Sequence, residues 1–214
     1  DGESPLPLYF FGPHGSGKSH LLALSAGLAN STNQIKIGFI PANIPILGTS
    51  EAVIRRLKIS FQESSWRSWG SHREYHFPDN NSIILFEGLD RQLKGLNKES
   101  RRRLRRELAE HPRLFLFATG VSLPPELTNK NEAFYQHFSP WPLQALDIEQ
   151  SQKLLSTTAG IETTQQPGWE NRCLTLANLS GGNPRSLAAL GNTCFNSPEA
   201  PASTLLRATL DQLT

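Results

Sequence analysis

The segment Gly12-Pro13-His14-Gly15-Ser16-Gly17-Lys18-Ser19 decides the fold of this chain. It matches the pattern G-x-x-x-x-G-K-[ST] at every fixed position. The apolar, aromatic run from Leu6 to Phe11 precedes it and predicts a buried strand, because the run is short and stops at Gly12-Pro13. The leucines and alanines after Lys18 predict a helix that ends near Asn30. The segment therefore has the strand-loop-helix context in which this pattern binds phosphate.

The residue types of this loop are suited to binding the phosphates of a nucleoside triphosphate. Its glycines let the backbone approach phosphate oxygens, and its N–H groups and the following helix N-terminus favour an anion. We expect Lys18 to reach the β- and γ-phosphates of ATP and the Ser19 hydroxyl to bind Mg²⁺, while His14 lines the pocket. The residues predicted to contact ATP or ADP are Gly12, Pro13, His14, Gly15, Ser16, Gly17, Lys18, Ser19 and His20.

Strands and helices alternate after the loop, which predicts an α/β fold with a parallel sheet and crossover helices. Further strands are expected at 35–40, 83–86, 114–117 and within 138–143, where two prolines weaken the pattern. Helices are expected at 51–60 and 99–110. Beyond residue 147 the pattern is helical throughout, at 148–159, 168–180, 184–195 and 202–213. We therefore predict a core of residues 1–147 and a helical lid of residues 148–214.

An acidic residue is needed near the phosphate loop, and the best candidate follows the apolar run 83–86. Glu87 stands at the strand end, where a carboxylate can enter the metal shell or act as a base. Gly88 stands where a second, hydrolytic acid is usual. Asp90, three residues beyond the strand end, is a weaker second candidate; the alternative is that it caps the next segment or pairs with Arg91. ATP binding is thus better supported than fast hydrolysis.

With these motifs in place, the chain resembles the AAA+ ATPases, closest to the origin-recognition-like and transposition-helper branch, with overlap toward signalling ATPases. Glu87 to Arg91, Phe117 to Gly120, residues 134–147 and Gly181 to Arg185 carry the resemblance. It implies that Thr119 is the first sensor, near the attacking water or γ-phosphate. It also implies that Arg185 is the second sensor, on a lid helix that Asn183 caps and Pro184 begins.

One feature of that family is missing. The resemblance implies an arginine finger before the fifth strand, but residues 131–137 contain no arginine, and Lys130 and His137 are the nearby candidates for a charge. Together with Gly88, this predicts slow hydrolysis or a nucleotide-gated switch.

Positive charge is concentrated in the middle of the chain. Residues 51–110 hold 13 Lys and Arg against 9 Asp and Glu, a net +4, whereas residues 111–214 have a net −2. Five arginines fall between Arg101 and Arg106, and Glu107 is spaced to pair with Arg103. This helix is either a solvated face or a contact for nucleic-acid phosphate or another subunit. Residues 61–77 interleave basic and aromatic residues, which suits either packing or single-strand binding.

Composition limits the remaining classes. The 214 residues can bury a core, and the chain has no apolar run of the roughly 20 residues that a membrane helix needs. The two cysteines fit a reducing, cytoplasmic setting as buried thiols. Because the chain lacks methionine and begins at Asp1, we expect a processed chain or part of a larger parent chain.

We therefore expect a RecA-like, three-layer core with a five-stranded parallel sheet and a small helical lid. Its catalytic residues would be Glu87, Thr119 and Arg185, and Ser19 and Glu87 would hold Mg²⁺. Besides nucleotide, the partners left open are further copies of this chain, a larger parent chain and DNA. The alternatives to a slow, Mg²⁺-dependent ATPase are a signalling or defence module with little hydrolysis and, least favoured, a small-molecule kinase.

Overall fold

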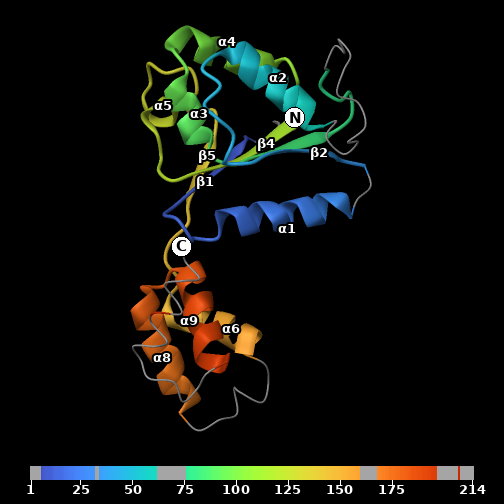
Figure 1. Ribbon diagram of the computed structural model, residues 1–214. Helices are drawn as coiled ribbons and strands as arrows, with labels where there is room; N and C mark the ends of the chain where they lie inside the picture. Colours follow the sequence, from blue (N-terminus) through green and yellow to red (C-terminus); the bar gives the residue numbers. More distant parts are fainter. Residues whose placement is uncertain (1–5, 32–33, 62–75, 160–167, 197–206, 208–214) are drawn as a thin grey trace. The chain divides into compact units, whose positions relative to one another are not determined.

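The computed structural model describes residues 6–31, 34–61, 76–159, 168–196 and 207 (Figure 1). The chain divides into two compact units. The first comprises Asp1–Gly12 and Lys18–Pro142, and the second comprises Pro13–Gly17 and Leu143–Thr214. Apart from Arg207, the helix expected at 202–213 lies outside the described residues.

A five-stranded parallel sheet forms the centre of the first unit. Its strands run in the order β2-β3-β4-β1-β5, and all four neighbouring pairs are parallel. The strands are β1 (Leu8–Phe11), β2 (Lys36–Ile40), β3 (Ser82–Phe86), β4 (Leu114–Gly120) and β5 (Ser139–Pro142). Because β1 and β4 lie inside this order, the phosphate loop after β1 follows a central strand. The predicted α/β fold with five parallel strands is confirmed.

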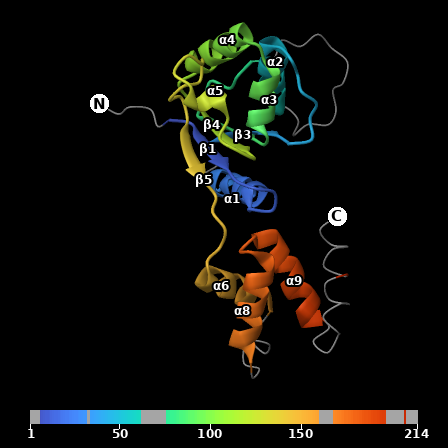
Figure 2. The ribbon, with the colours of Figure 1, turned by 90° about the vertical axis from the view of Figure 1, so that its left-hand side faces the viewer.

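Helices cover both faces of the sheet. Helix α1 (Lys18–Asn30) lies on one face, and α2, α3, α4 and α5 lie on the other, as both views show (Figures 1 and 2). These four helices span Ser50–Ser60, Leu89–Gly95, Lys98–Ala109 and Pro125–Thr128. The main core between them and the sheet is built around Tyr9, Phe86 and Phe134, each at most 1% exposed.

Side-chain caps start two of these helices where the sequence has a polar residue. Thr49 accepts a hydrogen bond from the Ala52 N–H at 3.2 Å before α2. Asn97 accepts one from the Ser100 N–H at 2.8 Å before α4. Helix α3 was not predicted, because it begins after Gly88 with no side-chain cap and is short.

Strand β5 lies at an edge of the sheet, beside β1. Two of its four residues are Pro140 and Pro142, which pair in register with Tyr9 and Phe11. The Ser139 N–H donates to the Pro7 carbonyl at 2.8 Å, so Ser139 directs its donor toward β1. Edge strands tolerate proline, which explains how the expected strand forms despite the weakened pattern.

The second unit contains three described helices around a small core of its own. They are α6 (Ile148–Ala159), α8 (Trp169–Ser180) and α9 (Pro184–Asn196). Leu155, Cys173 and Leu187 are fully buried between them, and Cys194 packs against this core. Burial raises the pKa of both thiols, so the cysteines pack as expected and stay protonated at neutral pH. None of the helices in the described ranges is long and apolar enough to cross a membrane.

Candidate functional site

The phosphate loop joins the end of β1 to the first residue of α1. Gly15 and Gly17 have φ angles of 80° and 92°, which are readily adopted by glycine alone. The Gly12 N–H donates to the Gly120 carbonyl at 3.3 Å, which ties the start of the loop to the end of β4. Gly17, at a fixed position of the pattern, and Gly15, at a free one, thus stand where the backbone favours glycine.

Lys18 begins α1 and turns its side chain back toward the start of the loop. Its Nζ donates to the Gly12 carbonyl at 2.7 Å. Burial lowers the pKa of Lys18, and the negative charges of Asp90 and Glu87 act in the opposite direction. Ser19 follows it in the first turn of α1 and is exposed. The structure therefore brings Lys18 into the field of both carboxylates singled out from the sequence.

The two carboxylates hold the loops that leave the sheet. Glu87 directly follows β3, as predicted, and its Oε2 accepts a hydrogen bond from the Ala42 N–H at 3.2 Å. Asp90 lies in the first turn of α3, and its Oδ2 accepts one from the Val121 N–H at 2.9 Å. Both acids thus stand where parallel strands end, which is where such sheets place their ligands.

The helix cap and the pairing with Arg91, considered as alternatives for Asp90, are both wrong. It hydrogen-bonds the backbone after β4, whereas Arg91 donates to the carbonyls of Ala42 and Ile44. Of the two carboxylates that act to raise the pKa of Lys18, Asp90 has the larger influence. The left-handed backbone of Gly88, with φ of 72°, turns the chain so that α3 carries Asp90 back to the sheet edge. No local pattern signals that turn.

Thr119 lies near the end of β4 and is 2% exposed. It pairs in register with Phe10, so it stands beside the strand that leads into the phosphate loop. The next residue, Gly120, lies against the Tyr9 hydroxyl and the Asp90 carboxylate. Tyr9 donates to the Ser122 carbonyl at 2.7 Å, and burial raises its pKa, so the hydroxyl remains neutral. The sensor role of Thr119 stays a prediction.

In the second unit, Asn183 caps α9 and also contacts the phosphate loop. Its Oδ1 accepts from the N–H groups of Arg185 at 3.1 Å and Ser186 at 3.2 Å, as predicted for the cap. Its Nδ2 donates to the His14 carbonyl at 2.8 Å, and the Arg185 N–H also donates to the Gly15 carbonyl at 3.2 Å. The sequence had no signal for this contact, because the two segments are far apart in the chain.

Asn183 explains why residue 15 of the loop is a glycine. A Cβ added to Gly15 would lie 2.5 Å from Asn183 Oδ1, in addition to the strain of a positive φ. Arg185 follows this cap and is exposed. Its predicted contact with the γ-phosphate stays a prediction.

His137 does not supply a charge at neutral pH. Burial, together with the smaller effect of the nearby Arg105, lowers the pKa of His137 to about 4. The ring packs edge-on against Phe138 and beside Phe134. The imidazole is thus a neutral part of the core, and Lys130 is exposed.

We expect the stability of the protein to fall between pH 6.5 and about pH 4 because of His137. In this range the unfolded chain protonates the imidazole, with its ordinary pKa of 6.5, whereas the folded chain keeps it neutral. The loss should be about 2 kcal/mol, below the full linkage value because the ring is only half-buried. Urea unfolding of the parent and His137→Gln at pH 7 and pH 4.5 measures it. An equal pH dependence in the two proteins would contradict the assignment.

Most of the interleaved segment 61–77 lies outside the described residues. Trp66, Arg67, Trp69, His72, Arg73 and Tyr75 belong to that part. Phe77 is described, and it packs in the core against His111 and under Lys58. The single-strand-binding interpretation of this segment stays a prediction.

Solved structures with this fold come from AAA+ ATPases. Cdc6p from Pyrobaculum aerophilum matches with a TM-score of 0.60 and 14% identity, over 90% of this chain and 55% of that one. The Aeropyrum pernix Orc1 protein, solved in complex with DNA, matches with a TM-score of 0.57 and 15% identity, over 98% and 60%. Caenorhabditis elegans PCH-2 matches with a TM-score of 0.55 and 10% identity, over 96% and 61%.

These similarities concern the fold. The chain has the AAA+ fold, so the resemblance stated from the sequence is confirmed at that level. The chain spans less than two thirds of the length of each of the three structures. No family model matches the sequence, and the curated proteins compared with it give no match.

Proposed function

We propose that this chain is an ATP-binding domain that hydrolyses ATP slowly and changes state with the bound nucleotide. The observation that carries the proposal is the position of Lys18, whose ammonium group returns to the Gly12 carbonyl beside Asp90 and Glu87. A triphosphate entering the glycine loop would meet this ammonium group, the N–H groups of the loop and the N-terminus of α1.

The residues present fit a Mg²⁺ ion that arrives with the nucleotide. The described residues contain no group of three or more His, Cys, Asp or Glu that would hold a metal by itself. Mg²⁺ at phosphates needs fewer protein ligands, because it keeps several waters. The exposed Ser19 hydroxyl and the half-buried Glu87 carboxylate provide oxygen donors of the required type. When bound, the ion would neutralise phosphate charge.

Slow hydrolysis is supported by what surrounds Glu87. Gly88 offers no second carboxylate, and its φ of 72° would strain any side chain placed there. His137 is neutral, and residues 131–137 contain no arginine. Glu87 therefore serves either the metal shell or the attacking water, and Thr119 and Arg185 complete the proposed set at the γ-phosphate. The same glycine favours the second candidate, a signalling module in which ATP is bound and hardly hydrolysed.

Equilibrium binding and turnover of labelled ATP, with and without Mg²⁺ and with and without DNA, test the proposal. Saturable, Mg²⁺-dependent ATP binding is the expected result, and its absence would overturn the proposal. Turnover that DNA stimulates supports a remodelling role, whereas binding with no DNA response supports the signalling module. Transfer of phosphate to a metabolite would favour the kinase.

We expect Glu87→Gln to lower turnover at least about tenfold and to weaken the dependence on Mg²⁺, because the amide can neither bind the metal as an anion nor accept a proton. The amide oxygen can still accept from the Ala42 N–H, so the local fold should be retained. Single-turnover hydrolysis measures the effect. Glu149→Gln, at an exposed position in α6, is the matched control. If Glu87→Gln and the control behave alike, the role given to Glu87 is wrong.

A further inference from the structure

Helix α4 uses two of its five arginines to hold the fold. Arg101, whose side chain is 13% exposed, binds Glu132 at 3.1 Å and the Leu96 carbonyl at 2.5 Å. Arg103 pairs with Glu51 on α2, and Glu107 pairs with Lys58 at 2.8 Å, so the predicted pairing of Arg103 with Glu107 is wrong. Arg101 and Arg103 are thus each paired with a carboxylate outside α4. The remaining three arginines have a different environment.

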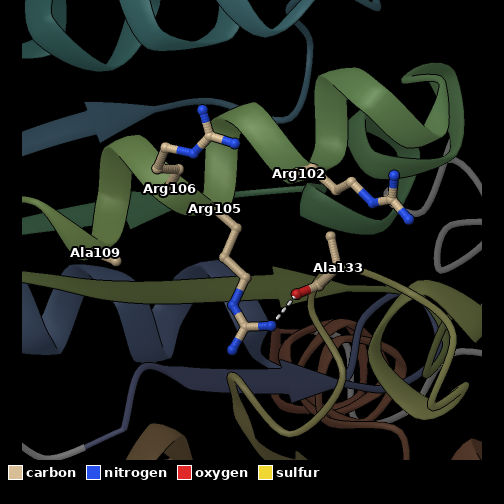
Figure 3. A pocket seen from close by; sticks show the side chains of 5 residues that line it. All are labelled: Arg102, Arg105, Arg106, Ala109 and Ala133. Carbon is tan, nitrogen blue, oxygen red and sulfur yellow. Dashed lines mark hydrogen bonds between the residues drawn. The ribbon is translucent and has the colours of Figure 1, made fainter.

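Arg102, Arg105 and Arg106 line a shallow groove together with Ala109 and Ala133 (Figure 3). The groove has a volume of about 350 Å³, and none of the described residues that line it carries a carboxylate. All three arginines are exposed. They lie at i, i+3 and i+4 on one helix, where like charges repel each other. We call this feature the α4 arginine groove.

The guanidinium groups of this groove are largely uncommitted. Arg105 donates to the Ala133 carbonyl, which fixes its direction and leaves most of its five donors available. Arg102 faces Glu99 at 3.9 Å, a pair whose two side chains are 57% and 80% exposed and which contributes little. In the described ranges, the Arg106 side chain has neither an ion pair nor a hydrogen bond. The described residues that line the groove thus give it a net positive charge.

The shape of the groove decides which anion it suits. The three side chains in Figure 3 point in different directions and do not converge on one point, so they do not form a pocket for one phosphate. A chain of phosphates, each several ångströms from the next, can reach cations that are spread apart in this way, and arginine is well suited to phosphate oxygens. The lining contains no aromatic, amide or hydroxyl side chain that would stack on a base or read its edge.

We propose that the α4 arginine groove binds the phosphate backbone of nucleic acid, without preference for sequence. This inference does not depend on the nucleotide site, because no residue of the groove belongs to the phosphate loop. Binding of this kind releases counterions, so its affinity must fall as salt rises, in proportion to the number of phosphates contacted.

The test compares two variants that lose the same charge. In the groove variant, Arg102, Arg105 and Arg106 are replaced by glutamine. In the control, the exposed Lys36, Lys94 and Lys153 are replaced by glutamine. Fluorescence anisotropy with a labelled mixed-sequence duplex of about 20 base pairs, from 50 to 200 mM salt, gives the affinity and its salt slope.

We expect the groove variant to bind the duplex at least about tenfold more weakly than the control, with a salt slope lower by about 2 to 3. Two duplexes of different sequence should bind the parent equally. The proposal is overturned if the groove variant and the control agree in both quantities, or if the parent does not bind DNA at 50 mM salt. A change in oligomeric state by sedimentation, with DNA binding unchanged, would also overturn it, because the groove would then be a contact between copies.

Two measurements separate this test from a folding defect and from the nucleotide site. ATP binding by the groove variant should equal that of the parent. The single variant Arg106→Gln removes an exposed side chain without a partner in the described residues, so it should fold and should lower the salt slope by about 1. An unchanged slope in Arg106→Gln would contradict the proposed contact.

Discussion

Replacing Lys18 by alanine should lower the affinity for ATP at least about 100-fold, which corresponds to about 2.7 kcal/mol of binding free energy. The ammonium group is the cation that α1 places beside the glycine loop, and its hydrogen bond to the Gly12 carbonyl holds it at the start of that loop. Burial lowers its pKa, so part of its hydration is already lost before a phosphate arrives. Charge-assisted hydrogen bonds in such surroundings are among the strongest in proteins.

Equilibrium binding of labelled ATP measures this effect, with Lys36→Ala as the control. Lys36 is an exposed lysine on β2, and its removal should leave ATP affinity unchanged. Thermal unfolding without nucleotide should show that both variants are folded. An affinity of Lys18→Ala within a few-fold of the parent would refute the nucleotide site itself, whatever the outcome for the α4 arginine groove.

Replacing Gly120 by alanine should reduce the free energy of unfolding by about 3 kcal/mol. Gly120 is the last residue of β4, and a Cβ there would overlap the Tyr9 hydroxyl and lie 2.8 Å from Cγ of Asp90. Tyr9 is fully buried and holds the Ser122 carbonyl, so it cannot move aside without losing that hydrogen bond. Asp90 is tied to the Val121 N–H. The added methyl group must therefore displace one of these residues.

Urea unfolding measures this loss against Gly27→Ala. Gly27 lies in α1 with open space around it, so alanine should stabilise the protein there, by up to about 1 kcal/mol. The background Tyr9→Phe identifies the cause, because it removes the hydroxyl that the new methyl group would meet. In that background Gly120→Ala should cost clearly less. The same cost with and without the hydroxyl would show that the predicted overlap is not the source.

The sheet and the phosphate loop could be predicted because their signals are local. A run as short as Ile83 to Phe86 is typical of a buried strand, because a helix needs more residues, and the loop pattern predicts a strand before it and a helix after it. Strand β5 was also predicted, although Pro140 and Pro142 weaken its pattern. It can form with these prolines because it lies at the edge of the sheet. Glu87 was found because it stands at a strand end.

The rest depended on tertiary contacts. Asp90 reaches the sheet edge through the left-handed backbone of Gly88, and the sequence pattern does not predict that conformation. Asn183 was predicted as a helix cap. Its second contact, to the His14 carbonyl, could not be predicted because the two residues are far apart in sequence. The pairing of Arg103 was wrong because i,i+4 spacing counts only neighbours on one helix, and Glu51 on α2 lies closer.

The prolines of β5 have a consequence for how this sheet can grow. Backbone donors alternate in direction along a strand, and Ser139 turns its donor toward β1, so positions 140 and 142 face outward. Both outward positions are proline, and neither carries a hydrogen to share. A strand from another copy would therefore find no N–H donor at either position, which disfavours joining of two sheets at this edge.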